Sequence, residues 1–144
     1  MSKHINSGNC QKCEEILNKY GGTHKKLKEW FKDKQSKNYS LHCSCSGRDR
    51  IAQNLNHVNG NSNAEFGKSP HNYKPSLAID IFFTDARYPN DIYPIKLFEE
   101  IMESLDEGLE WFGSKESKYY ELPHIQLKNW KTLIKDDKLE LIIT

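Results

Sequence analysis

Apolar residues recur at intervals of three and four near the start of the chain, a spacing that predicts two amphipathic helices. The two apolar groups are Ile16, Leu17 and Tyr20, followed by Leu27, Trp30 and Phe31. The pair Gly21-Gly22 lies between them and favours a break. Two further helices are predicted, one over 51–58 and one that begins at Pro94. The apolar stripe of the last helix is Ile95, Phe98, Met102 and Leu105.

Alternating or β-branched apolar runs predict strands elsewhere in the chain. The predicted strands are Tyr39–Cys45, Leu77–Phe83, Pro123–Leu127 and Leu139–Ile143, and a Lys/Asp-rich connection separates the last two. In the run LAIDIFF, Leu77, Ile79 and Ile81 share one face, so Asp80 points to the other. The Gly/Asn/Ser-rich segment NGNSNAEFGKS is expected to form a loop. We therefore predict an α+β fold with a small antiparallel sheet surrounded by helices.

Length and charge narrow the class of protein. The 144 residues suffice for one core, so we expect a single domain over 1–144, with 1–38 as its helical N-terminal part. The formal net charge of +1 gives no general attraction to nucleic acid. No apolar run reaches membrane-spanning length, and MSKHINSGNC lacks the apolar core of a signal peptide. We expect a cytoplasmic, monomeric protein without nucleic-acid or membrane partners.

Four cysteines occur as two pairs, Cys10-x-x-Cys13 and Cys43-x-Cys45. If the pairs meet in space, they supply four thiolates for a structural zinc ion. The long spacer and the single residue between Cys43 and Cys45 depart from zinc ribbons. Reduced, partly buried thiols are the alternative interpretation.

Asp80 lies on an otherwise apolar strand, where its charge needs a hydrogen bond, an ion pair or a metal ion. His71 is a candidate partner because the turn at Pro75 can fold its loop back toward Asp80. His124 supplies a third ligand, and three protein ligands leave one position for water, as in hydrolytic zinc sites. Glu121 is then a spare carboxylate able to accept and return a proton. The alternative is that each histidine is an ordinary hydrogen-bonded residue and that Asp80 caps a turn.

The segments GRDRIAQN, GNSNAEFGKSPHNYKPSLAIDIF and ELPHIQL, in this order, resemble the zinc D-alanyl-D-alanine metallopeptidase family. Within that family they resemble the phage endolysins that act as L-alanyl-D-glutamate peptidases. The family pattern is Arg and Gln five residues apart, then Ser-x-His, a turn, Ala-x-Asp, and an acidic residue three before His. The matching residues are Arg48 and Gln53, Ser69 and His71, Ala78 and Asp80, and Glu121 and His124. His71 and Asp80 lie nine residues apart here, whereas many members have seven.

The resemblance implies the hedgehog/D-Ala-D-Ala peptidase fold and a zinc cofactor. His71, Asp80 and His124 would hold the zinc, and Glu121 would be the catalytic base and then the acid. Arg48 would bind substrate or stabilise the developing oxyanion, and Arg50 is its competitor for this role. Gln53 and Ser69 would contact the substrate, although Ser69 has the alternative of holding its loop.

The expected function is hydrolysis of a peptide bond in the peptidoglycan stem, by a phage endolysin that takes part in host lysis. Such an enzyme would be made in the cytoplasm of the infected host and would act on the periplasmic cell wall after release. The sequence does not determine which peptide bond is cut, so a D-Ala-D-Ala carboxypeptidase is an alternative. A second alternative is a non-enzymatic module that binds zinc through cysteines.

Overall fold

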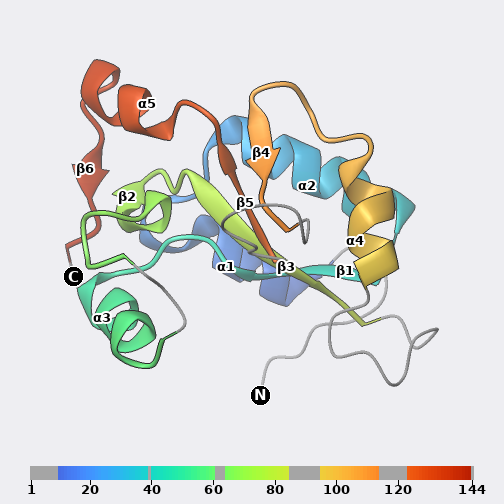
Figure 1. The fold of residues 1–144 in the computed structure, drawn as a ribbon, viewed down its shortest axis with the longest axis horizontal. Helices are drawn as coiled ribbons and strands as arrows, with labels where there is room; N and C mark the ends of the chain where they lie inside the picture. Colours follow the sequence, from blue (N-terminus) through green and yellow to red (C-terminus); the bar gives the residue numbers. More distant parts are fainter. Residues whose placement is uncertain (1–9, 39, 61–63, 85–94, 114–122, 144) are drawn as a thin grey trace.

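A four-stranded antiparallel sheet forms the centre of the computed structural model, which describes residues 10–38, 40–60, 64–84, 95–113 and 123–143 (Figure 1). The strands follow the order β1-β3-β5-β4 across the sheet. Their bounds are β1 (Leu41–Cys45), β3 (Ala78–Phe83), β5 (His124–Leu127) and β4 (Leu109–Trp111). A second sheet pairs two short strands, β2 (Tyr73–Lys74) and β6 (Glu140–Leu141). The fold is therefore α+β with a small antiparallel sheet, as the sequence predicts.

Five α-helices and two short 3-10 helices are found among the described residues. They are α1 (Gln11–Asn18), α2 (Lys25–Lys37), α3 (Arg50–Val58), α4 (Ile95–Met102), α5 (Trp130–Asp136), η1 (Lys19–Gly21) and η2 (Pro70–Asn72). The chain turns between α1 and α2 at Gly21 and Gly22, which have φ of 88° and 91°. This left-handed backbone favours glycine and explains the break. Within the described part of the chain, none of the helices has the length and apolarity needed to cross a membrane.

The hydrophobic core lies where α1 and α2 pack against the sheet. Leu17 and Phe31 from the helices belong to the same buried cluster as Ile79 and Ile81 of β3 and Ile125 of β5. Each of these five side chains has no exposed surface. Because side chains alternate along a strand, burial of Ile79 and Ile81 turns the side chain between them to the opposite face. The apolar pattern of β3 thus fixes the direction of Asp80.

The strand register brings polar residues together on that opposite face. Asp80 lies directly across from His124 on β5 and from Cys45 on β1. Between Cys43 and Cys45 the β1 register shifts by a bulge. A bulge redirects the following side chain, so Cys45 lies beside Asp80 although Cys43 belongs to the core cluster.

The element predictions are confirmed for both N-terminal helices, for α3 and for three of the four strands of the central sheet, β1, β3 and β5. Helix α4 begins at Ile95, whereas Pro94 and Tyr39 lie outside the described residues. The Lys/Asp-rich connection between the last two predicted strands contains a helix that is not predicted, α5, in which Trp130, Leu133 and Ile134 pack against the core. The predicted strand Leu139–Ile143 is shortened to β6, and β2 and β4 are not predicted.

Replacing Ile79 by alanine is expected to lower the free energy of unfolding by about 2–5 kcal/mol, because the lost side-chain atoms leave a cavity in the core. Chemical denaturation measures this loss. The control is Ile51→Ala on α3, where the side chain is 70% exposed, and its effect should stay within about 0.5 kcal/mol. Equal effects of the two substitutions would contradict the assignment of the buried face of β3.

Candidate metal centre

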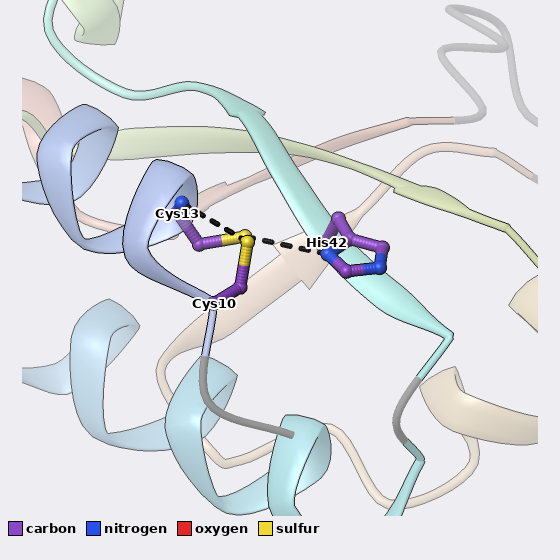
Figure 2. A group of neighbouring side chains, drawn as sticks. All are labelled: Cys10, Cys13 and His42. Atoms are coloured by element: carbon purple, nitrogen blue, oxygen red, sulfur yellow. Dashed lines mark hydrogen bonds between the residues drawn. The ribbon is translucent and has the colours of Figure 1, made fainter. Parts of the chain in front are cut away.

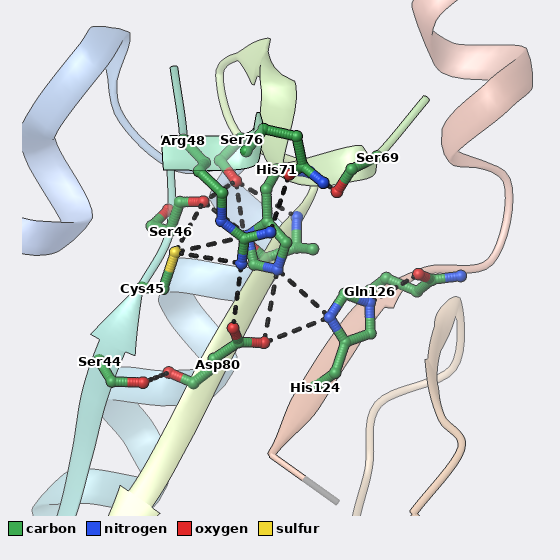
Figure 3. A network of polar contacts seen from close by, with 12 residues as sticks. Ser44, Cys45, Ser46, Arg48, Ser69, His71, Ser76, Asp80, His124 and Gln126 are labelled. Carbon is green, nitrogen blue, oxygen red and sulfur yellow. Dashed lines mark hydrogen bonds and ion pairs between the residues drawn. The ribbon is translucent and has the colours of Figure 1, made fainter. Parts of the chain in front are cut away.

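His71, Asp80 and His124 form a triangle of potential ligand atoms on the polar face of the sheet (Figure 3). His71 Nε2 lies 3.2 Å from His124 Nδ1 and 3.4 Å from Asp80 Oδ1. The third edge, from His124 Nδ1 to Asp80 Oδ1, measures 3.2 Å. These residues come from η2, β3 and β5, so the triangle exists only in the folded chain. The sequence prediction that the three residues meet agrees with this geometry.

The triangle fits a small tetrahedral cation. Bonds of about 2.0–2.1 Å to nitrogen and oxygen at tetrahedral angles place neighbouring ligand atoms about 3.3 Å apart. The three measured edges, at 3.2–3.4 Å, agree with this spacing. The two imidazole nitrogens and one carboxylate oxygen are also a donor set that divalent transition metals take in proteins.

His71 reaches the triangle from η2, whose first turn is capped by Ser69. The Ser69 hydroxyl accepts a hydrogen bond from the backbone N–H of His71 at 3.2 Å. On the ring, Nδ1 lies 2.7 Å from the carbonyl oxygen of Ser46. A carbonyl only accepts, so Nδ1 donates to it and Nε2 is the nitrogen that faces the triangle. This outer hydrogen bond fixes the tautomer that a metal ligand needs.

His124 is held in the opposite tautomer by a chain of side chains across β5 and β4. Its Nε2 donates to Gln126 Oε1 at 2.7 Å, which leaves Nδ1 toward the triangle. The Gln126 amide nitrogen donates in turn to Glu110 Oε1 at 2.7 Å. Gln126 and Glu110 are direct partners in the strand register. The carboxylate of Glu110 therefore orients the amide that orients His124.

Arg48 neutralises the side of Asp80 that faces away from the histidines. Its Nη2 lies 3.3 Å from Asp80 Oδ2, whereas both histidines approach Oδ1. Its Nη1 donates to Gln53 Oε1 at 2.8 Å. Gln53 has no exposed surface, and its amide nitrogen donates to the carbonyl of Ala64 at 2.6 Å. The buried Gln53 side chain therefore fixes the position of the Arg48 guanidinium through its hydrogen bond with Nη1.

Asn72 is a residue that the sequence interpretation missed. Its side-chain oxygen accepts from the backbone N–H groups of Gly67 and Ser69, and its amide nitrogen donates to Arg48 O and Gln53 Oε1. The side chain is completely buried. Asn72 thus ties the η2 turn to the Arg48 segment. The spacing Ser69-x-x-Asn72 is the capping-box pattern that could have revealed it.

The charges of the triangle stabilise one another. Burial disfavours the ionised carboxylate, but the positive charge of His71 and the close contacts of both rings with the carboxylate outweigh it and hold the pKa of Asp80 far below its usual range. Burial also opposes protonation of His71, yet Asp80 and Cys45 overcome it and raise the pKa of His71 to about 10. A cation at the triangle would replace the proton that these three atoms otherwise share, so metal binding releases protons.

The remaining predicted site residues lie in distinct places. Arg48 is 8% exposed at the triangle, whereas Arg50 is an exposed residue whose guanidinium lies over the Phe66 ring, 5.3 Å from its centroid. Ser69 is buried and caps η2. This position agrees with the alternative role given above, in which Ser69 holds its loop. Glu121, the predicted base, lies outside the described residues.

The two cysteine pairs do not meet as one four-thiolate group among the described residues, and the four cysteines are reduced thiols, three of them buried, in line with the alternative interpretation. Cys10 and Cys13 meet His42 in a second group of potential metal ligands, and this group does not include Cys43 or Cys45. Cys45 lies near the first triangle instead, with its sulfur 3.9 Å from His71 Nδ1 and 3.5 Å from Arg48 Nη2. The alternation of β1 and its bulge send the two neighbouring thiols to different surroundings.

Comparison with known proteins gives a structural likeness. No protein-family model matches the chain, and no curated protein matches its sequence. Among solved structures, the chain is similar to the L-Ala D-Glu endopeptidase ChiX of Serratia marcescens, with a TM-score of 0.62 and 18% sequence identity. The match covers 85% of this chain and 90% of that chain. The two proteins therefore share a fold, and it is one that a peptidase uses.

Replacing Gln126 by leucine is expected to weaken binding of a divalent metal by about 10- to 100-fold, because His124 loses the acceptor that fixes its ring. Competition with a chromogenic chelator measures the affinity. The matched control is Glu110→Gln, which retains an oxygen that accepts from the Gln126 amide and should bind within a few-fold of the unmodified chain. Undiminished affinity in Gln126→Leu would show that His124 is oriented in another way.

Proposed function

We propose that this chain is a zinc peptidase that hydrolyses a peptide bond in the stem peptide of bacterial peptidoglycan. The observation that carries the proposal is the triangle of His71, Asp80 and His124, whose edges of 3.2–3.4 Å suit tetrahedral zinc. The order of the motifs in the sequence and the fold shared with an L-Ala D-Glu endopeptidase support the same conclusion. The hedgehog/D-Ala-D-Ala peptidase superfamily is the corresponding fold assignment.

A zinc ion at this site would polarise the scissile carbonyl and lower the pKa of a water molecule toward about 7. The chain supplies the ligands, since each histidine directs its second ring nitrogen at the triangle and Asp80 presents one carboxylate oxygen, and the ion would displace the proton held there. Two neutral imidazoles and one carboxylate leave a net positive charge on the site, which suits an electrophile. Three protein ligands also leave room for water and substrate.

Glu121 is the proposed general base and subsequent acid. Its place three residues before His124 matches the family pattern, in which the acidic residue accepts a proton from the attacking water and returns it to the leaving amine. A glutamate is suited to both steps because a carboxyl group accepts and donates through the same oxygens. In this proposal, removing Glu121 abolishes proton transfer but leaves the zinc ligands intact.

Arg48 is proposed to bind a substrate oxygen next to the zinc. Its guanidinium carries five donors, and the described contacts use Nη1 for Gln53 and Nη2 for Asp80 and Cys45. The contacts with Gln53 and Asp80 hold the planar group beside the triangle, so its remaining N–H groups are available to a carbonyl or carboxylate of the substrate. Gln53 and Ser69 then act as positioning residues for Arg48 and His71.

The bond between L-Ala and D-Glu is the first substrate to test, because it is the bond named for the structural neighbour. A D-Ala-D-Ala carboxypeptidase would use the same chemistry on another bond, and mass spectrometry of digested muropeptides separates the two. We further propose that the enzyme is a phage endolysin, made in the infected host's cytoplasm and acting on the periplasmic wall. A non-enzymatic zinc module is the rival, and it predicts no released peptides.

Glu121→Ala should lower peptidoglycan hydrolysis by about 10²- to 10⁴-fold while the chain still binds zinc, because general acid–base catalysis has this magnitude. Muropeptide release and zinc content are measured on the same preparation. His71→Ala is the contrasting variant, and it should lose both zinc at this site and activity. Full activity of Glu121→Ala would exclude Glu121 as the base.

Arg48→Lys should lower kcat/KM for peptidoglycan fragments by at least 10-fold with zinc content unchanged, because lysine keeps the charge but loses the planar fork. Arg50→Lys, two residues away on an exposed part of α3, is the matched control and should retain the activity of the unmodified chain. An equal loss in both variants, or a loss in Arg50→Lys alone, would contradict the assignment of Arg48.

A further inference from the structure

A second group of metal-type ligands lies at the edge of the sheet, where α1 begins (Figure 2). Cys10 is the N-cap residue of α1, Cys13 lies in its first turn, and His42 is on the edge strand β1. Their ligand atoms all lie within 4.8 Å of one another. The residues are 1%, 1% and 0% exposed. None of the three belongs to the His71, Asp80 and His124 triangle.

The measured sulfur-to-nitrogen distance suits tetrahedral zinc. With bonds of about 2.3 Å to sulfur and 2.0–2.1 Å to nitrogen, tetrahedral angles place these two atoms about 3.6 Å apart. Cys13 Sγ lies 3.6 Å from His42 Nδ1. Two cysteines separated by two residues also form the usual half of a structural zinc site.

Three N–H groups surround the two sulfurs. The backbone N–H of Cys13 donates to Cys10 Sγ at 3.4 Å, and that of Cys43 donates to Cys13 Sγ at 3.3 Å. The Gln35 amide nitrogen approaches Cys13 Sγ at 3.6 Å. A neutral thiol is a weak acceptor, whereas a thiolate attracts donors strongly. The donors are therefore placed as the outer hydrogen bonds of metal-bound thiolates commonly are.

We propose that Cys10, Cys13 and His42 bind a structural zinc ion, distinct from the catalytic one. A fourth ligand is not identified among residues 10–38, 40–60, 64–84, 95–113 and 123–143. The ion joins the start of α1 to the outer strand of the sheet. At this edge the backbone N–H of Cys43 has no strand among the described residues to pair with, and it donates to the sulfur of Cys13 instead. Its role is to fix the N-terminal helix, because metal ligation adds to folding free energy.

Titration of the reduced full-length chain with Co²⁺ under anaerobic conditions tests the proposal. Thiolate ligands give a sulfur-to-cobalt charge-transfer absorption that nitrogen and oxygen ligands do not give. We expect this absorption in the unmodified chain and in His71→Ala, which removes a ligand of the other site. It should be lost in the double variant Cys10→Ser and Cys13→Ser, whose zinc content should also fall by one ion per chain.

Cys43→Ala and Cys45→Ala are the matched controls, because each removes a nearby thiol outside the group, and both should retain the absorption. The proposal is overturned if the unmodified chain gives no such absorption, if the Cys10 and Cys13 double variant retains it, or if either control loses it. Should the double variant fail to fold, His71→Ala and the two single-cysteine controls still decide the outcome. Persistence of the absorption in His71→Ala also separates this site from any failure of the proposed catalytic one.

Discussion

The negative charge of Asp80 is the constraint around which the polar face of the sheet is organised. A carboxylate on a central strand is stable there only if charged or hydrogen-bonding groups compensate it. The compensation is divided between its two oxygens, since both histidines approach Oδ1 and Arg48 approaches Oδ2. Arg48 therefore balances the carboxylate without occupying the oxygen that faces the metal position. The same charge explains why His71 would hold a proton strongly and a cation in its place.

The geometry of the triangle depends on groups one layer further out. His71 is oriented by the Ser46 carbonyl and His124 by the Gln126 amide, so each ring has one nitrogen committed and the other directed inward. The three ligand residues come from a turn and two strands, and their spacing follows from strand register and from the capped η2 turn. Rigid elements can hold ligand atoms to the few tenths of an ångström that metal coordination requires.

The sequence predicts the parts of this arrangement that periodicity and motif order determine. The alternation in LAIDIFF predicts both the buried isoleucines and the outward Asp80, and the ordered segments identify His71 and His124 as its partners. The sequence interpretation missed the roles of Gln126 and Glu110 in orienting His124. Gln126 could have been found, because it lies two positions after His124 and therefore on the same strand face. Helix α5 was missed because its charged residues obscure Trp130, Leu133 and Ile134 at helical spacing. The sequence leaves the grouping of the cysteines undecided because a bulge in β1, which no local sequence pattern indicates, separates Cys43 from Cys45.

Strand β1 connects the two ligand groups. His42 lies near its start and Cys45 at its end, roughly 10 Å apart at the rise of an extended strand. The next residue, Ser46, supplies the carbonyl that fixes the tautomer of His71. A zinc ion at Cys10, Cys13 and His42 would thus restrain the strand whose end orients His71, a ligand of the proposed catalytic site. In the sheet that the described residues form, β1 is an edge strand with one strand neighbour, so it depends on such lateral restraint more than β3 or β5 does. In this proposal Cys10 and Cys13, which lie outside the motif that resembles the peptidase family, would support the proposed catalytic site through β1.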